Sequence, residues 1–208
     1  MIFLWGEWRW FTLPAALALG AALTGQPRVA IGALVVTLLL TMLFSQKTPK
    51  TPALPLGILA PASGTIVGLE TTQDDRLARS IVRITIKVGL RDGYHCFSPT
   101  EGLIKECWHR RVGANPSAPE SANSYSSYWV QTDEGDDLLI EQFRGNLVSR
   151  SILDLQPGER IGQGHLSGHL RFGGTVTCGL PSNARLVAQI GQSVRAGEDL
   201  LANFVHPE

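Results

Sequence analysis

Cysteine, lysine and clustered charge are scarce in this chain of 208 residues, and each scarcity excludes a class of protein. The three cysteines are too few and too scattered for a disulfide framework, and none belongs to a Cys-x-x-Cys pair that would hold zinc. The formal net charge is zero, without a run of basic residues. We therefore expect no nucleic-acid partner and no metal, and the thiols fit a reducing compartment.

Long apolar runs are confined to residues 1–44. Two runs, 11–23 and 29–44, flank a turn-like break at 24–28. Each is somewhat shorter than the roughly 20 residues that cross a bilayer, and neither has a polar stripe. We predict a membrane anchor of two apolar helices that spans the bilayer or re-enters it deeply. A signal peptide is disfavoured because no basic segment precedes the first run, and buried helices of a soluble protein are the other alternative.

Positive charge predicts the orientation of this anchor. Arg9, Lys47 and Lys50 lie on its outer flanks, whereas only Arg28 lies between the runs. The positive-inside rule then places both ends, and the domain that follows, on the cytoplasmic side of the inner (cytoplasmic) membrane. The polar, proline-spaced residues 45–54 predict an extended linker, so that the globular domain occupies 55–208.

The globular part has the pattern of a mostly β domain. Residues 80–88 alternate apolar and polar side chains, as a strand does, and 128–132 and 138–140 flank an acidic, glycine-containing turn typical of a hairpin. Residues 115–127 are rich in Ser, Pro, Ala and Asn and predict a mobile loop. With 22 glycines and 12 prolines, the composition suits short strands and many turns.

Two segments near the C-terminus, 155–161 and 190–200, each have a strand–turn–strand pattern with glycine in the turn. The second is similar to the hairpins of lipoyl- and biotinyl-carrier barrels. Residues 60–67 are similar to the opening strand of such a barrel. Carriers present a modified lysine at a hairpin tip, and none of the four lysines of this chain lies in such a motif. A swinging-arm carrier is therefore excluded, and a barrel-like β sandwich is the predicted fold.

Four blocks together resemble one family. The last contains Arg-Phe-Gly-Gly at 171–174, and the blocks comprise 59–64, 92–99 with Gly102, 142–150 with 158–160, and 168–174 with 180–181 and 194–197. In this order they resemble the short, membrane-anchored prokaryotic type of phosphatidylserine decarboxylase. The resemblance implies a proenzyme that cleaves itself between glycine and serine. It also implies a pyruvoyl cofactor made from that serine, which accepts electrons during the decarboxylation that forms phosphatidylethanolamine.

The chain departs from the family pattern at the positions that carry out self-cleavage. Self-cleavage in the family uses an Asp-His-Ser arrangement, and the resemblance places Ser63, Tyr94 and Gly174 at these positions. Gly174, which follows Gly173, has neither a hydroxyl to attack nor a β-carbon from which a pyruvoyl could form. His95 adjoins Tyr94, but neighbouring residues of a strand face opposite sides. We therefore expect no pyruvoyl cofactor and an inactive protein. Thr175 and Cys178 are the alternative cleavage residues, although ordinary packing in a strand explains both.

Three functions stay open: a non-catalytic lipid-binding protein, a scaffold subunit of a membrane complex, and an active decarboxylase with an atypical cleavage residue. Arg110, Arg111 and Arg150 are the candidates for contact with an anionic lipid headgroup. Membrane lipid, and other membrane-protein subunits, are the expected partners. His109, His165 and His169 lack the setting of metal ligands, and the acidic residues at 133–137 lack the spacing of a calcium loop.

Overall fold

The computed structural model describes residues 16, 27–44, 49–90, 92–110, 125–145 and 149–205. It divides the chain into two compact units, Met1–Thr48 and Pro49–Glu208. Residues 49–54, which were expected to form an extended linker, hold no helix or strand and belong to the second unit. Gln163 fastens this segment, because its amide nitrogen donates to the carbonyl oxygens of Leu54 at 3.1 Å and Gly57 at 2.6 Å.

The first unit contains helix α2, Pro27–Phe44. Proline suits the first turn of a helix, and the residues that follow are nearly all apolar. Large side chains protrude from α2, with Ile31, Leu34 and Leu38 each more than 60% exposed. The expectation of a membrane-spanning hairpin is not supported, because no helix among the described residues is long and apolar enough to cross a membrane. The first apolar run, apart from residue 16, lies outside the described residues.

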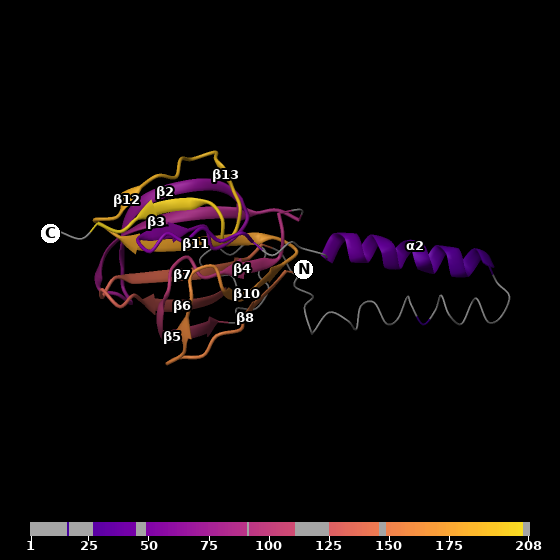
Figure 1. The fold of residues 1–208 in the computed structure, drawn as a ribbon, viewed down its shortest axis with the longest axis horizontal. Helices are drawn as coiled ribbons and strands as arrows, with labels where there is room; N and C mark the ends of the chain where they lie inside the picture. The colour runs from indigo at the N-terminus through magenta and orange to yellow at the C-terminus, as the bar shows by residue number, and fades with distance from the viewer. Residues whose placement is uncertain are drawn as a thin grey trace. The chain divides into compact units, whose positions relative to one another are not determined.

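The second unit is mostly β (Figure 1). Its strands are β1 (Gly57–Leu59), β2 (Gly64–Asp74), β3 (Arg79–Val88), β4 (His95–Phe97), β5 (Gly102–Arg110), β6 (Tyr125–Gln131), β7 (Asp137–Arg144), β8 (Arg150–Leu153), β9 (Arg160–Ile161), β10 (Leu166–Arg171), β11 (Gly174–Pro181), β12 (Arg185–Leu186), β13 (Ser193–Val194) and β14 (Leu200–Asn203). They form an eight-stranded sheet in the order β13-β2-β3-β11-β7-β6-β5-β9 and two three-stranded sheets, β1-β14-β12 and β4-β10-β8.

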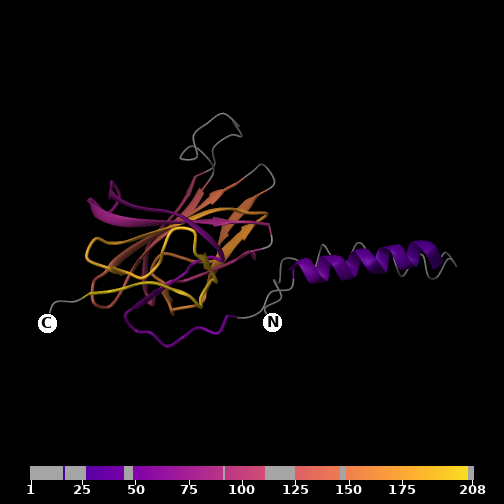
Figure 2. The same cartoon turned by 90° about the horizontal axis from the view of Figure 1, so that it is seen from above.

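The eight-stranded sheet is antiparallel and curls into a half-barrel (Figures 1 and 2). Alternation along the strands sends one set of side chains inward. The main core combines residues of all three sheets, among them Ile58, Ile84, Tyr128, Leu170 and Leu201. On the opposite face, Leu77, Ile81 and Leu139 form a small second cluster with Trp108 and Trp129.

Several expected elements are confirmed and others need correction. The strand at 80–88 lies within β3, and β6 and β7 pair with Gln131 opposite Asp137, as the acidic turn predicted. The expected loop at 115–127 is wrong at its end, because Tyr125–Ser127 belong to β6; 115–124 lie outside the described residues. The carrier-like hairpin at 190–200 is also wrong: β13 pairs with β2, whereas β14 pairs with β1 and β12.

Candidate functional site

The bend between β10 and β11 carries the Arg-Phe-Gly-Gly sequence. Phe172 has φ 60° and Gly173 has φ 78°, so two consecutive residues occupy the left-handed region before β11 begins at Gly174. A bulky residue is rarely found there and tolerates the conformation only where its surroundings hold it. The ring of Tyr94 lies 6.0 Å from that of Phe172 and contributes to this restraint.

Gly174 is packed where a side chain has no room. A Cβ built on Gly174 would lie 2.3 Å from the carbonyl oxygen of Phe143 and 3.2 Å from the amide nitrogen of Gly145. A Cβ on Gly145 would in turn lie 2.9 Å from the Cα of Gly174. The backbones of β11 and of the segment after β7 approach each other through two glycines. Serine at position 174 would therefore require this bend, or the end of β7, to move.

Ser149 joins the two sides of this contact, and the sequence analysis did not single it out. Its hydroxyl is buried, donates a hydrogen bond to the carbonyl oxygen of Gly173 at 2.5 Å, and accepts one from the amide of Gly145 at 3.3 Å. The carbonyl group of Gly173, which the resemblance places at the cleaved peptide bond, thus accepts a hydrogen bond from a side chain. No motif marks Ser149 in the sequence, since a lone serine beside a strand is ordinary there.

Tyr94, at the position of the family's histidine, lies beside the bend. It is 4% exposed, and its hydroxyl donates to the carbonyl oxygen of Leu90 at 3.3 Å. The amide of Leu170 donates to the carbonyl oxygen of Tyr94 at 2.8 Å. The phenol is a hydrogen-bond donor in this arrangement, whereas a histidine acting as a general base would have to accept a proton from the nucleophile.

His95 contacts a different group of residues. It opens β4 opposite His169 of β10, and the two rings lie 5.2 Å apart, edge to face. The Nε2–H of His169 donates to Asp154 at 2.9 Å. Burial lowers the pKa of both histidines to about 4, helped by His169 for His95 and by Arg171 for His169. Both are therefore neutral at neutral pH, and the structure aligns His95 with His169 rather than with Phe172.

Ser63, at the position of the family's aspartate, immediately precedes β2. Its hydroxyl accepts a hydrogen bond from the amide of Ala196 at 2.9 Å. Register places the start of β2, the end of β3 and the start of β11 at one end of the sheet, because Thr65 pairs with Lys87 and Lys87 with Thr175. Ser63, Tyr94 and Gly174 thus belong to one end of the fold. As a neutral hydroxyl, Ser63 supplies no charge to orient a base.

The alternative nucleophiles are ordinary strand residues. Thr175 pairs with Lys87 on one side and Phe143 on the other. Cys178 is fully buried, and burial raises the pKa of its thiol to about 12, so that the reactive thiolate is absent at neutral pH. Within the described residues, no group of three His, Cys, Asp or Glu side chains is placed to hold a metal ion.

Two of the candidate arginines, Arg110 and Arg150, belong to strands of different sheets. Arg150, which opens β8, pairs with Arg171 at the end of β10, directly before the bend. Arg110 ends β5 and pairs with Tyr125, which in turn pairs with Phe143 beside Arg144. Arg144 pairs with Gly174 itself. Arg111 lies outside the described residues.

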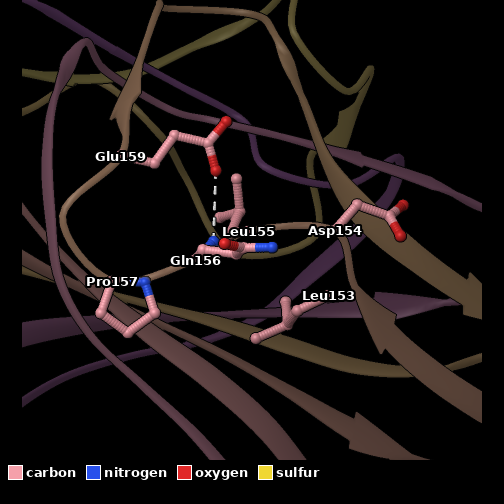
Figure 3. A pocket seen from close by; sticks show the side chains of 6 residues that line it. All are labelled: Leu153, Asp154, Leu155, Gln156, Pro157 and Glu159. Carbon is pink, nitrogen blue, oxygen red and sulfur yellow. Dashed lines mark hydrogen bonds between the residues drawn. The ribbon is translucent and has the colours of Figure 1, made fainter.

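An open surface hollow of about 710 Å³ lies along the loop after β8 (Figure 3). One short segment, 153–159, supplies its lining, and the amide of Gln156 donates to Glu159 at 3.2 Å across it. Its lining includes Asp154, which holds His169, but no arginine. It therefore lacks the cationic groups expected of a phospholipid headgroup site.

These observations define a class of protein: a mostly β domain with a curled eight-stranded sheet, in which an Arg-Phe-Gly-Gly bend joins β10 to β11. A family model for phosphatidylserine decarboxylase matches residues 41–202, and the chain belongs to this family. Because Gly174 has no β-carbon, the residues at the bend do not fit the family's pyruvoyl group.

Individual relatives agree with the family model. The chain is 31% identical over 170 residues to the phosphatidylserine decarboxylase proenzyme of Nitrosomonas eutropha, which covers 80% of this chain and 79% of the relative. The proenzyme of Nitrosomonas europaea gives the same values. That of Mycolicibacterium vanbaalenii is 30% identical over 169 residues, 77% of this chain and 72% of the relative. No solved structure matches the chain significantly.

Proposed function

We propose that this member of the phosphatidylserine decarboxylase family does not decarboxylate. Instead it acts at a membrane, as a lipid-binding protein or as a scaffold subunit of a membrane complex. The observation that carries the proposal is the bend at Gly174. The position that must provide both a nucleophile and the carbon skeleton of the cofactor has no side chain, and Phe143 and Gly145 leave no room for one.

The surroundings of the bend support the same conclusion. Self-cleavage needs a base to take the proton of the nucleophile, and a third group that orients the base. Tyr94 donates its hydroxyl proton to Leu90, and Ser63 accepts from a backbone amide. His95, the nearest imidazole in sequence, pairs with His169 instead. The three positions therefore offer no base–orienter pair.

The N-terminal unit supports action at a membrane. Helix α2 exposes Val29, Ile31, Leu34, Val35, Val36 and Leu38, and such a concentration of exposed apolar side chains marks a surface that is covered in use. We infer that membrane lipid contacts these side chains and that the chain is attached to the inner (cytoplasmic) membrane. The distribution of Arg9, Arg28, Lys47 and Lys50 favours a β domain that faces the cytoplasm.

An active decarboxylase is the second candidate, and the relatives favour it, since those named above are described as decarboxylase proenzymes. In this chain Thr175 is the nearest hydroxyl after Gly173. Cleavage there would leave a 2-ketobutyryl group on the C-terminal fragment in place of pyruvoyl. Its extra methyl would have to fit within β11.

The intact mass of the full-length protein tests the proposal. A single species of 22.5 kDa that releases no carbon dioxide from phosphatidylserine vesicles is the expected result. Two fragments divided near Gly173, the smaller one blocked by a keto-acyl group, would overturn it. The variant Thr175→Val then serves as a control, because loss of cleavage in this variant would identify Thr175 as the nucleophile.

A further inference from the structure

The outer face of the eight-stranded sheet, opposite the main core, carries polar and aromatic side chains that the proposed function does not use. The register joins four of them in one row across neighbouring strands, namely Trp108 of β5, Ser127 of β6, Glu141 of β7 and Thr177 of β11. Tyr125 lies two residues before Ser127 on β6 and therefore points to the same face. Trp108 and Tyr125 are half-buried, whereas Glu141 is 4% exposed.

A cation from the chain itself lies over this row. Arg76, in the turn between β2 and β3, forms an ion pair with Glu141 and donates to the hydroxyl of Ser127 at 2.9 Å. Its guanidinium carbon lies 5.1 Å from the centre of the Trp108 ring and 5.7 Å from that of Tyr125. A carboxylate and two ring faces attract a guanidinium group, because all three present negative charge to it. We call Trp108, Tyr125, Ser127 and Glu141 the cage.

The carboxylate of Glu141 needs a cation, whichever group supplies it. A charged side chain this deeply buried has lost most of its contact with water, so leaving it unpaired is costly. Its Oε1 pairs with Arg76, whereas its Oε2 accepts from the hydroxyl of Thr177 at 3.2 Å and lies 3.9 Å from Arg83. Arg83 also lies 3.5 Å from Asp74 and is therefore shared between two carboxylates. The cage is thus a cation site by its own composition.

The contacts of Arg76 favour a guanidinium group over an ammonium group. Its Nη1 donates to Ser127 and its Nη2 to Glu141, while its central carbon lies near both rings. A planar fork with separate donors makes these contacts at once, whereas the compact ammonium group of lysine is a single point of charge.

The turn that carries Arg76 holds its own shape. The carboxylate of Asp74 accepts from the amides of Arg76 at 2.9 Å and Leu77 at 3.1 Å, so these bonds stay within the turn. Arg76 and Leu77 contact the outer face, whereas Asp75 and Ala78 beside them are exposed. Ala78 has φ 49°, a left-handed conformation that costs free energy in a residue other than glycine. These features favour a turn that leaves the sheet as one unit and takes Arg76 with it.

We propose that the cage binds the guanidinium group of an arginine side chain from another protein, and that Arg76 fills the cage until such a ligand displaces it. Because Arg76 is tethered beside the cage, it competes at a high local concentration and weakens the binding of an external ligand. The inference is independent of the proposed function, since it concerns neither cleavage nor attachment to a membrane. The alternative is an ion pair between Arg76 and Glu141 that only stabilises the fold.

Titration of detergent-solubilised full-length protein with the amide of Nα-acetyl-arginine, followed by tryptophan fluorescence, tests the cage. Arg76→Ala empties the cage and should bind this ligand at least about tenfold more tightly than the unaltered protein. Arg76→Ala with Glu141→Gln keeps the shape of the cage without its charge, and should lose about tenfold or more of that affinity. The amide of Nα-acetyl-lysine should bind Arg76→Ala more weakly than the arginine ligand.

Arg79→Ala is the matched control variant. It also removes an arginine ion pair from the β2–β3 hairpin, but the partner is Asp137 at 2.8 Å rather than a residue of the cage. Asp137 keeps Trp129 and Gln131 as hydrogen-bond donors. Arg79→Ala should therefore bind the arginine ligand as weakly as the unaltered protein does. An equal gain of affinity in Arg76→Ala and Arg79→Ala would assign binding to a loosened hairpin and overturn the proposal.

Hydrogen exchange in the unaltered protein tests displacement without any variant. The arginine ligand should accelerate exchange at residues 74–78, and the lysine ligand at the same concentration should not. Unchanged exchange at 74–78, or a folded Arg76→Ala that does not bind the ligand, would overturn the proposal and leave the ion pair as a stabilising contact. The intact mass, which tests the proposed function, is independent of these results.

Discussion

The hydroxyl of Ser149 donates a hydrogen bond to the carbonyl oxygen of Gly173, the carbonyl that precedes the degenerate position 174. Because the same hydroxyl accepts from the amide of Gly145, it ties the segment after β7 to the bend before β11. Phe172 and Gly173 hold left-handed backbone conformations beside this bond. A buried side chain thus stabilises a bend whose backbone conformation costs free energy to maintain.

Ser149→Ala should weaken the bend. Without the hydroxyl, the buried carbonyl of Gly173 and the amide of Gly145 lose a partner, which costs about 1–3 kcal/mol of unfolding free energy. Hydrogen exchange at residues 172–176 should also accelerate. Urea unfolding of the detergent-solubilised full-length protein provides the measurement. Ser151→Ala is the matched control, since its hydroxyl donates to the buried Gln142 at 2.9 Å and not to the bend. Equal acceleration of hydrogen exchange at residues 172–176 in the two variants would contradict this role of Ser149.

Gly174→Ser should not restore self-cleavage. The new Cβ would meet the carbonyl oxygen of Phe143, and overpacking of this kind costs about 1–3 kcal/mol. The hydroxyl would also find no base, because Tyr94 donates to Leu90. Mass spectrometry should show one intact chain, with a lower unfolding midpoint.

Gly174→Ala separates the effect of the added Cβ from that of the added hydroxyl, since it introduces the Cβ alone. Equal destabilisation of the alanine and serine variants would establish that the packing against Phe143 is responsible. Efficient cleavage of the serine variant by itself would show that a base is present after all, and would contradict the proposed loss of the catalytic arrangement.

Local patterns predicted the parts of this structure that depend on local physics. Alternation along 80–88 and the acidic turn at 133–137 located β3 and the β6–β7 hairpin, because side-chain period and turn chemistry are properties of neighbouring residues. The composition of 115–127 was misleading for Tyr125–Ser127, where pairing with Arg110 and Phe143 on either side outweighs weak strand propensity.

These local patterns did not predict which distant strands pair or which residues are buried. Residues 190–200 have a hairpin pattern, yet β13 and β14 pair with β2 and β1, partners more than a hundred residues away in the chain. Family motifs located Gly174, Ser63 and Tyr94, but not the crowding at Gly174 or the contact from Ser149. The crowding and the contact depend on how β7, β8 and β11 pack together. No spacing of residues in the sequence indicates that packing.

The histidine pair should make stability depend on pH. Burial holds the pKa of His95 and His169 at about 4, below the ordinary value of 6.5. The unfolded chain therefore binds more protons between these values. The contribution is complete above about pH 6.5 and is lost as the pH falls towards 4, by on the order of 3 kcal/mol for each histidine. Asp154 contacts His169 at 2.9 Å, and Arg171 interacts with it electrostatically.

Urea unfolding at a series of pH values checks this dependence. In His169→Asn, the unfolding free energy should fall less between about pH 6.5 and pH 4. His165→Gln, at an exposed position of the preceding loop, should leave this pH dependence unchanged. If His169→Asn lost as much stability at acid pH as the unaltered protein, groups other than this histidine would be responsible.

Replacing Glu141 should lower the unfolding free energy more than breaking a surface ion pair does. Glu141 is 4% exposed, pairs with Arg76 and Arg83, and accepts from Thr177 at 3.2 Å. Glu141→Ala leaves the two guanidinium groups without this partner in a partly desolvated place, at a cost of about 3–5 kcal/mol. Asp133→Asn, which breaks an ion pair with Arg160 in which both side chains are 64% exposed, should leave the urea midpoint nearly unchanged because water screens that pair. If the two variants unfolded at the same urea concentration, burial would not be what gives the Glu141 network its strength.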